Sequence, residues 1–267
     1  MLARMEEESS FEKELGGALL ASVSRSFYLT LKALPAVLRE PISLAYLLAR
    51  TADTIADTAE VPAGTRIHTL QGFADLVQGR VGDGRILSVE LEKNFRPFQT
   101  DPSEATLMSR IQEALAWLAT MRDARLKAVR DVLEPIIHGQ KLDIERFPSA
   151  TPLRSLQTSG ELDEYTWLVA GCVGEFWTRL CFSEMPDAFV PGASEEEMIP
   201  LGIRYGKGLQ LVNILRDIQK DARLGRCYLP AEEWRPLGFS EGDVAADPLV
   251  LRPVWEKWII PAEEPLR

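Results

Sequence analysis

Cysteine and histidine are scarce in this chain, which limits the metal sites and cross-links that it can form. The 267 residues include three cysteines (Cys172, Cys181 and Cys227) and two histidines (His68 and His138). The cysteines form no CxxC pair, and neither histidine has metal-ligand spacing with a cysteine or with the other histidine. These spacings exclude a zinc knuckle and a disulfide framework, and the odd number of thiols suits a reducing compartment.

The chain also lacks a long hydrophobic run and a recognisable signal peptide. No segment reaches the roughly 18 uninterrupted apolar residues that a membrane span needs. The first 14 residues are acidic and polar, unlike a secretion signal. We therefore expect a cytoplasmic protein, with at most a peripheral contact to the inner membrane face.

Basic residues are outnumbered by acidic ones. Lysine and arginine total 30 against 40 aspartates and glutamates, a formal net charge of −10. A surface that binds a nucleic-acid backbone needs a basic excess, so we expect no nucleic-acid partner. Any recognition of phosphate must come from a local cluster of basic side chains.

Strand signals are nearly absent, whereas helical periodicity covers most of the chain. Stretches rich in Leu, Ala, Glu and Arg predict helices at about 14–31, 40–59, 64–81, 104–145, 161–183 and 195–224. Prolines such as Pro35 and Pro41 predict the breaks, and Pro135 is expected to kink or split its helix. Ser194, followed by three glutamates, predicts a capped helix start. We expect one all-α domain over residues 1–267, whose sites are built by side chains projecting inward from facing helices.

Two pairs of aspartates stand out, each with a spacing of four residues. We call Asp53 and Asp57 the first aspartate pair, and Asp217 and Asp221 the second aspartate pair. Four residues are about one helical turn, so both carboxylates of a pair project from one face and can reach a common hard cation. A solvated helix surface produces the same spacing, so the neighbouring residues must decide between the two interpretations.

The neighbours of both pairs favour a site over a solvated surface. At about 100° per residue, Tyr46 and Arg50 share an arc of about 60° with the first aspartate pair. Gln210 and Asn213 share about 80° with the second aspartate pair, and Arg216 lies at the edge of that arc. A solvated face more often carries Glu and Lys than short Asp and Asn beside Tyr.

Further residues suited to phosphate lie before the first pair and after the second. Ser24-Arg25-Ser26-Phe27 offers hydroxyls, a guanidinium and an aromatic ring, either for phosphate oxygens or as a helix cap. Gly225 is expected to end the last predicted helix and to turn Arg226 and Tyr228 back over the site. A solvated basic helix end is the alternative interpretation.

An uncharged segment, residues 165–174, predicts a helix that is buried nearly all round. On a helical wheel Tyr165, Val169, Cys172 and Phe176 share one face. This face suits either an apolar tunnel with one hydroxyl near its mouth or ordinary core packing.

Taken together, these motifs resemble those of the squalene/phytoene synthase family. The resemblance covers about residues 20 to 235 and rests on the segments Ser24–Phe27, Tyr46–Asp57, Asp163–Gly174 and Gln210–Pro230. It implies the all-α isoprenoid synthase fold, with the two aspartate helices facing each other across a central cavity. It also implies a magnesium site formed by Asp53, Asp57, Asn213, Asp217 and Asp221.

The resemblance assigns roles to the remaining candidates as well. Catalysis would fall to Tyr165, which would assist ionisation or proton loss, and to Arg50 and Arg216, which would help to hold diphosphate. Substrate binding would fall to Ser24, Arg25, Ser26, Phe27, Tyr46, Gln210, Arg226 and Tyr228. No obligate protein partner is implied.

The implied activity is the magnesium-dependent head-to-head condensation of two farnesyl diphosphates through a cyclopropyl diphosphate, followed by NADPH reduction to squalene. Leu48–Thr54 resembles the squalene branch of the family. Phytoene or dehydrosqualene synthesis without reduction, and a non-catalytic role in assembly, are the alternatives. A head-to-tail prenyl transferase or terpene cyclase would normally carry DDxxD instead of the first aspartate pair. No Gly-x-Gly-x-x-Gly fingerprint is present, so any NADPH site must be built in another way.

Two departures from the family pattern are visible. Ala56 stands where squalene synthases often carry an acid. The family usually continues beyond the position of Arg267 through further helices, so we expect a short or truncated form or a differently built C-terminal wall.

Overall fold

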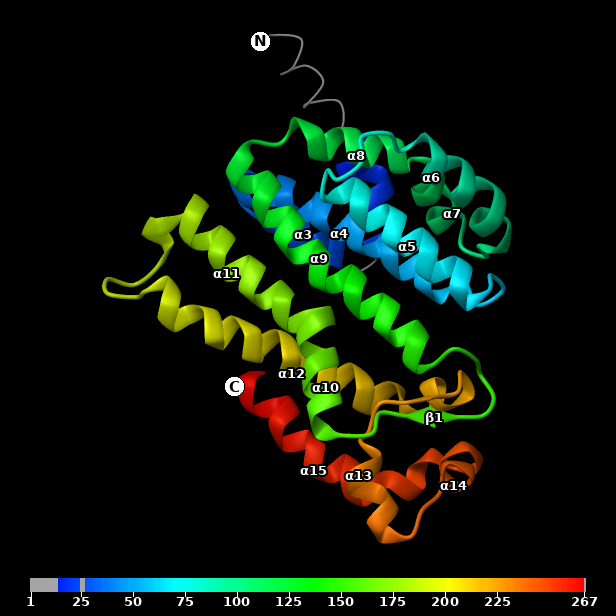
Figure 1. The fold of residues 1–267 in the computed structure, drawn as a ribbon. Coiled ribbons are helices and arrows are strands. Elements are labelled where there is room, and N and C mark those ends of the chain that lie inside the picture. Colours follow the sequence, from blue (N-terminus) through cyan, green and yellow to red (C-terminus); the bar gives the residue numbers. More distant parts are fainter. Residues whose placement is uncertain (1–13, 25–26, 267) are drawn as a thin grey trace. The chain divides into compact units, whose positions relative to one another are not determined.

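The computed structural model describes residues 14–24 and 27–266, and its fold is shown in Figure 1. The contacts divide the chain into two compact units. The first unit comprises Met1–Lys141 and Leu180–Ala188, and the second comprises Leu142–Arg179 and Phe189–Arg267.

The first unit is built from helices and short helical turns. Its α-helices are α2 (Leu20–Ser24), α3 (Phe27–Ala33), α4 (Ala36–Asp57), α5 (Ala63–Val77), α6 (Arg85–Glu90), α7 (Pro102–Ser109), α8 (Ile111–Thr120) and most of α9 (Asp123–Arg146). π-helical turns occur at Glu14–Leu19 and Leu91–Phe95, and 3-10 turns at Arg96–Phe98 and Pro186–Ala188.

The second unit is also helical and contains the one pair of strands in the described part of the chain. Its α-helices are α10 (Ser159–Thr166), α11 (Cys172–Glu184, up to Arg179), α12 (Glu195–Arg223), α13 (Ala231–Trp234), α14 (Glu241–Ala246) and α15 (Arg252–Glu263). A π-helical turn spans Trp167–Gly171, and 3-10 turns span Arg235–Leu237, Pro248–Leu251 and Glu264–Leu266. Strands β1 (Arg154–Ser155) and β2 (Arg226–Cys227) pair in parallel, Arg154 opposite Arg226 and Ser155 opposite Cys227.

Helix α4 presents the first aspartate pair because its opposite face is buried. Leu44, Leu47, Leu48 and Ile55 are completely buried, and each contributes about 1.5–3 kcal/mol relative to an exposed side chain. This apolar face fixes the rotation of the helix, so the polar residues of the other face cannot turn inward. Helix α4 therefore holds its acidic residues in a defined direction.

Helix α12 begins and ends where its capping residues predict. The Ser194 side chain accepts a hydrogen bond from the backbone N–H of Glu197, which confirms the predicted cap. The helix ends at Arg223, and Gly225 follows with φ of +76°, a left-handed conformation that glycine adopts without strain. The chain then enters β2, which fixes the position of Arg226.

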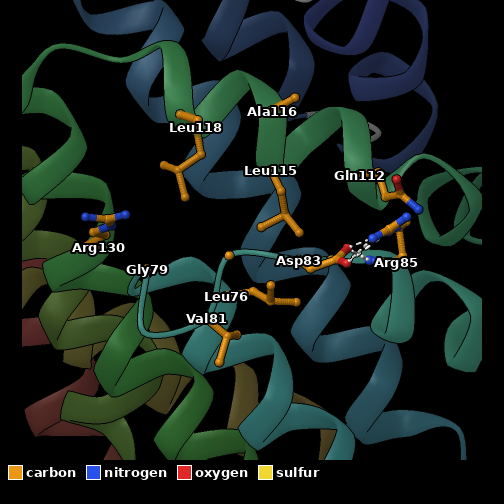
Figure 2. Close-up of a pocket in the computed structure, with 13 residues that line it drawn as sticks. Leu76, Gly79, Val81, Asp83, Arg85, Gln112, Leu115, Ala116, Leu118 and Arg130 are labelled. Carbon is orange, nitrogen blue, oxygen red and sulfur yellow. Dashed lines mark hydrogen bonds and ion pairs between the residues drawn. The ribbon is translucent and has the colours of Figure 1, made fainter.

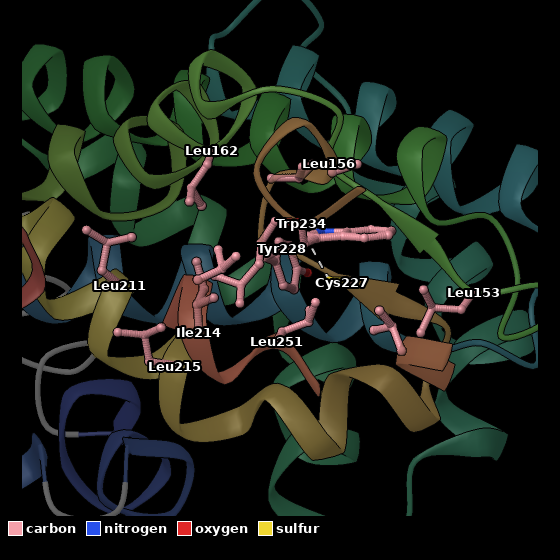
Figure 3. Close-up of a cluster of buried hydrophobic side chains, with 14 of the residues drawn as sticks. Leu153, Leu156, Leu162, Leu211, Ile214, Leu215, Cys227, Tyr228, Trp234 and Leu251 are labelled. Atoms are coloured by element: carbon pink, nitrogen blue, oxygen red, sulfur yellow. Dashed lines mark hydrogen bonds between the residues drawn. The ribbon is translucent and has the colours of Figure 1, made fainter. Parts of the chain in front are cut away.

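The core of the second unit forms around the turn that follows α12. Trp234 is completely buried and donates from its indole N–H to the carbonyl of Leu229 at 3.1 Å (Figure 3). Helix α15 packs along α12 (Figure 1), and Trp255 donates from its indole N–H to the carbonyl of Leu215 at 2.9 Å. The buried cluster thus anchors the end of α12 and the segment that carries Arg226 and Tyr228.

Several expected boundaries were wrong. Pro41 lies inside α4 and is buried instead of marking a break. The long helix predicted over 104–145 is divided at Arg110 and near Met121, and α9 is not split at Pro135. The helices at 85–98 and 231–263 were not predicted. In the described part of the chain, every helix is too short or too polar to cross a membrane.

Candidate functional site

The first aspartate pair lies in the last two turns of α4 and is held by an arginine and an amide. Arg50 donates from Nη1 to Asp53 Oδ2 at 2.7 Å, and Gln140 of α9 donates from Nε2 to Asp53 Oδ1 at 3.2 Å. The second arm of the Arg50 fork, Nη2, is paired with Glu104 of α7. The Arg50 guanidinium therefore lies between two carboxylates of different helices.

The electrostatics of this pair favour a bound cation. Burial and then the charge of Asp57 raise the pKa of Asp53 to about 6, against the opposing effects of Arg50 and Gln140. The Asp53 side chain is 36% exposed, so solvent screens part of this repulsion. Even with the Arg50 ion pair, the negative charge of this corner is not fully compensated, and a divalent cation would compensate it.

The second aspartate pair projects from the C-terminal half of α12. Arg216 donates from Nε and Nη2 to the two carboxylate oxygens of Asp217 at 2.9 and 2.8 Å, which lowers the pKa of Asp217. Burial and then the charge of Asp217 raise the pKa of Asp221 to about 6, although Arg226 and Lys220 oppose the shift. Burial of Asp221 and the nearby charge of Asp217 thus both disfavour a second negative charge, and a bound cation would offset them.

Two amides lie on the same stripe of α12, before the second aspartate pair. Asn213 donates from Nδ2 to Gln210 Oε1 at 3.4 Å, and both side chains are half-buried. This contact turns the Asn213 amide oxygen away from Gln210 and leaves it available as a ligand. The predicted stripe of Gln210, Asn213 and the second aspartate pair is therefore formed.

A buried network surrounds the predicted tyrosine. The Tyr165 and Tyr228 rings stack with centroids 4.6 Å apart and planes at 21°. Tyr228 donates its hydroxyl hydrogen to Asp143 Oδ1 at 2.8 Å, and Arg226 Nη1 pairs with Asp143 Oδ2 at 3.0 Å. Burial raises the pKa of both tyrosines well above the ordinary value, so both hydroxyls stay protonated.

Asp143 is a site residue that the sequence patterns did not identify. It is 6% exposed and belongs to α9. At about 100° per residue it falls within about 20° of Ile136, on the apolar face of that helix. An acidic residue on an apolar face was the signal that could have identified it.

The N-terminal motif is described only in part. Ser24 is buried, and its hydroxyl donates to the carbonyl of Leu20 in the same helix. The Phe27 and Tyr46 rings lie 5.3 Å apart, and the Tyr46 hydroxyl donates to the Val23 carbonyl at 3.3 Å. Arg25 and Ser26 lie outside the described residues, so their predicted contacts with phosphate remain predictions.

The uncharged segment differs from its predicted course. Trp167 is 36% exposed, so the helix is not buried nearly all round. A π-helical turn spans Trp167–Gly171, and its wider turn shifts all later residues relative to a regular helical wheel. The predicted face that joins Tyr165 to Phe176 is therefore wrong in detail, although Cys172 and Phe176 are buried.

The predicted site residues are divided between the two units. The first unit holds Ser24, Phe27, Tyr46, Arg50, Asp53 and Asp57, and the second holds Tyr165, Gln210, Asn213, Arg216, Asp217, Asp221, Arg226 and Tyr228. Within the described residues, no three Asp, Glu, His or Cys side chains gather closely enough to hold a metal by themselves. Magnesium typically takes one or two carboxylates and completes its shell with phosphate and water, so two-carboxylate sites fit it.

A pocket of about 520 Å³ lies elsewhere in the first unit, between the α5–α6 loop and α8 (Figure 2). None of its lining residues was predicted as a site residue. Asp83 and Arg85 pair with each other there at 2.7 Å, and Arg130 donates from Nε to the Val77 carbonyl at 2.8 Å. The charges of this pocket are largely engaged within the protein, which makes it a poor match for diphosphate.

Comparison with known proteins decides the family. The family model described as squalene/phytoene synthase matches residues 20–267. This chain belongs to the squalene/phytoene synthase family. A bifunctional lycopene cyclase/phytoene synthase of Phaeosphaeria nodorum is 30% identical over 227 residues, which cover 84% of this chain and 35% of that protein. A presqualene diphosphate synthase of Sinorhizobium fredii is 31% identical over 222 residues, covering 83% of this chain and 64% of that protein.

Solved structures agree on the fold. A ligand complex of TcSQS matches with a TM-score of 0.63 at 21% identity and covers 86% of this chain and 60% of that one. A dehydrosqualene synthase with ligand matches with a TM-score of 0.56 at 19% identity and covers 99% of this chain and 76% of that one. The predicted all-α isoprenoid synthase fold is confirmed. This chain thus spans less than two thirds of the length of the two curated relatives and of the TcSQS chain.

Proposed function

We propose that this protein is a magnesium-dependent prenyl transferase that joins two prenyl diphosphates head to head. The observation that carries the proposal is the self-repelling carboxylate pair in each unit, with an arginine beside it. We further propose that residues 1–267 form one isoprenoid synthase domain.

In this proposal, Asp53 and Asp57 of the first unit and Asn213, Asp217 and Asp221 of the second are the magnesium ligands. Bound magnesium would neutralise the negative charge that develops on the departing diphosphate. The carboxylate oxygens are the hard ligands that this ion prefers, and substrate phosphate and water would complete its shell. All four aspartates are present, which argues against a non-catalytic role in assembly.

The arginines would exchange partners when substrate binds. Arg50 and Arg216 are paired with aspartates of the two pairs, so magnesium binding to those carboxylates would free their guanidinium forks. A guanidinium fork matches phosphate oxygens in two places. Arg50 and Arg216 would then hold the diphosphate, together with Arg226. The hydroxyl hydrogens of Ser24 and Tyr228 are already donated to the Leu20 carbonyl and to Asp143, so we do not assign them to the diphosphate.

The protein must also protect a carbocation, because ionisation of the allylic C–O bond leaves one behind. Aromatic ring faces stabilise cations, and an apolar lining excludes water. Phe27 and Tyr46 lie ring to ring in the first unit, and Phe176 is buried in the second. We assign the lining of the cation site to these rings, and assistance at the reacting atoms to Tyr165.

For the product we propose squalene from two farnesyl diphosphates, with NADPH as hydride donor. The relative named presqualene diphosphate synthase favours a second candidate, in which the reaction stops at the cyclopropyl diphosphate. Relatives named phytoene synthase keep the longer substrate geranylgeranyl diphosphate as a third possibility for the test. Because the hydrocarbon products are insoluble in water, we propose a cytoplasmic enzyme that contacts the membrane peripherally.

Product analysis tests this proposal. Purified protein is incubated with magnesium and either farnesyl diphosphate or geranylgeranyl diphosphate, with and without NADPH, and the extract is analysed by mass spectrometry. We expect released diphosphate and a cyclopropyl diphosphate or C30 hydrocarbon, which becomes squalene when NADPH is supplied. A cyclopropyl diphosphate that persists with NADPH would select the second candidate. A C40 product from geranylgeranyl diphosphate, without a product from farnesyl diphosphate, would show that the longer diphosphate is the substrate. The absence of a product from both diphosphates would refute the proposed activity.

A further inference from the structure

Asp143 is a buried carboxylate that holds two of the predicted substrate-binding residues, Arg226 and Tyr228. It lies in α9, and the residues it contacts lie in and directly after β2. Its two oxygens are divided between two partners: Oδ1 accepts from the Tyr228 hydroxyl at 2.8 Å, and Oδ2 pairs with Arg226 Nη1 at 3.0 Å. The Asp143 side chain is 7% exposed and the Arg226 side chain 18%. A carboxylate in this position is costly to bury unless both oxygens are satisfied, as they are in this network.

The contact with Asp143 also fixes the ring on which Tyr165 packs. An ionised carboxylate has no hydrogen to donate, so Tyr228 must give its single hydroxyl hydrogen to Asp143. This hydrogen bond holds the Tyr228 ring in one direction. The Tyr165 ring stacks on the Tyr228 ring, with centroids 4.6 Å apart and planes at 21°. The direction of the Tyr165 side chain therefore depends on the Asp143 carboxylate.

We propose that Asp143 is a positioning residue, which orients the Tyr165 side chain for the reaction through the stacked Tyr228 ring. The same carboxylate holds Arg226 in place for the diphosphate. This inference rests on the proposed prenyl transferase function.

The location of the network supports the inference. The charge of Asp221 acts on Tyr165, and the charge of Arg226 acts on Asp221, so the three groups lie within electrostatic reach of one another in the second unit. Tyr165 is thereby placed beside the predicted metal and diphosphate ligands. An ion pair with only a structural role would need Arg226 and Asp143, but not the hydrogen bond from Tyr228.

The orientation can be measured without any enzymatic assay. The chain has five tyrosines, so protein labelled with ¹³C at tyrosine Cζ gives a simple NMR spectrum that reports hydrogen bonding at each hydroxyl. Tyr165→Phe and Tyr228→Phe assign two of the signals. We expect Asp143→Asn to shift the Tyr228 signal directly and the Tyr165 signal through the stacked Tyr228.

A matched control separates positioning from loss of a buried ion pair. Glu184 pairs with Arg125 at 2.5 Å in the first unit, with side chains 17% and 22% exposed. Glu184→Gln should destabilise the protein about as much as Asp143→Asn, yet leave the Tyr165 signal and turnover near their wild-type values. Asp143→Asn should lower kcat about 10- to 100-fold, the range typical of residues that orient a reactive group.

Tyr228→Phe supplies the second variant, because it removes the hydrogen bond to Asp143 and leaves the Asp143–Arg226 pair intact. It should move the Tyr165 signal and lower kcat with little change in KM, whereas Asp143→Asn should also raise KM because Arg226 is released. A Tyr165 signal that stays in place in both variants would overturn the inference, as would Asp143→Asn turnover equal to that of Glu184→Gln. If wild-type protein forms no product, the proposed function fails, and the NMR spectra still decide the orientation.

Discussion

Arg50 donates a hydrogen bond to Asp53 at 2.7 Å within the helix that carries the first aspartate pair. The arginine proposed to hold diphosphate therefore occupies part of the place that a metal ion would take. Its second arm is held by Glu104 of α7. Metal binding to Asp53 and release of Arg50 toward diphosphate would thus be one event.

Replacement of Arg50 should have opposite effects on metal binding and on turnover. Arg50→Met removes a cation that competes for Asp53, so magnesium affinity without substrate should rise about 1.4- to 5-fold, as expected for an ion pair worth about 0.2–1 kcal/mol. Diphosphate release from substrate should fall at least about tenfold, because the guanidinium is lost. Calorimetric titration with magnesium and a diphosphate-release assay measure the two effects. Arg80→Met, which removes an exposed arginine paired with Asp75 and Glu134, is the control. Equal magnesium affinity and turnover in Arg50→Met and wild type would contradict the proposal that Arg50 leaves Asp53 for the diphosphate when magnesium binds.

Magnesium binding should weaken as the pH falls through about 6. The pKa values of Asp53 and Asp221 are both raised to about 6, so protons compete with the ion below that pH. Calorimetric titrations in buffers of different ionisation enthalpy should detect proton release on binding near pH 6 and almost none near pH 8. A magnesium affinity that does not change between about pH 8 and pH 5 would refute the role of these two carboxylates.

The metal-free protein should gain stability when one of these carboxylates is neutralised. The pKa of Asp53 is higher in the folded than in the unfolded state, so the folded state binds the proton more tightly. Protonation of Asp53 therefore adds to the free energy of unfolding. This contribution is largest below about pH 4 and is lost as the pH rises to about 6. Asp53→Asn should therefore unfold at a higher temperature than wild type near pH 8 without magnesium. The difference should shrink towards pH 4 and reverse when magnesium is added. Thermal unfolding followed by circular dichroism measures these unfolding temperatures. A variant that is less stable than wild type at pH 8 would show that the fold fully compensates the negative charge of Asp53.

Gly225 should be required for both the end of α12 and the placement of Arg226. Its φ is +76°, and a Cβ there would lie 2.4 Å from the Ala150 carbonyl oxygen. Gly225→Ala should therefore cost more than the roughly 1 kcal/mol of backbone strain alone. Gly238→Ala is the matched control, since Gly238 has φ of +91° and open space around it. Chemical denaturation of both variants measures the costs, and equal values would show that the Ala150 contact moves away at little cost.

The parts of the fold that local chemistry determines were predictable from the sequence. Ser194 caps α12 and Gly225 follows its end, because a capping hydroxyl and a left-handed glycine act within one helical turn. The buried face of α4 follows from its 3.6-residue period. The two polar stripes were visible for the same reason, and Gln210 and Asn213 indeed lie together.

Features that depend on distant contacts were not predictable. Pro41 is tolerated inside α4 because burial of that face outweighs the lost backbone hydrogen bond, and a helical wheel contains no such information. The partners of Arg50 and Tyr228, namely Glu104 and Asp143, lie 54 and 85 residues away along the chain. Such pairings arise only when the helices pack, so Asp143 was missed although the residues it contacts were found.

The magnesium role of the two aspartate pairs is the central claim, and a comparison of single substitutions tests it most directly. Diphosphate release from farnesyl diphosphate is measured at saturating magnesium for wild type, Asp53→Asn, Asp217→Asn and the control Asp131→Asn, whose carboxylate pairs with exposed Lys127 at the surface. We expect the two pair variants to fold normally and to lose turnover by a factor of about a hundred or more, and the control to match wild type. Near-normal turnover in Asp217→Asn would contradict the magnesium role.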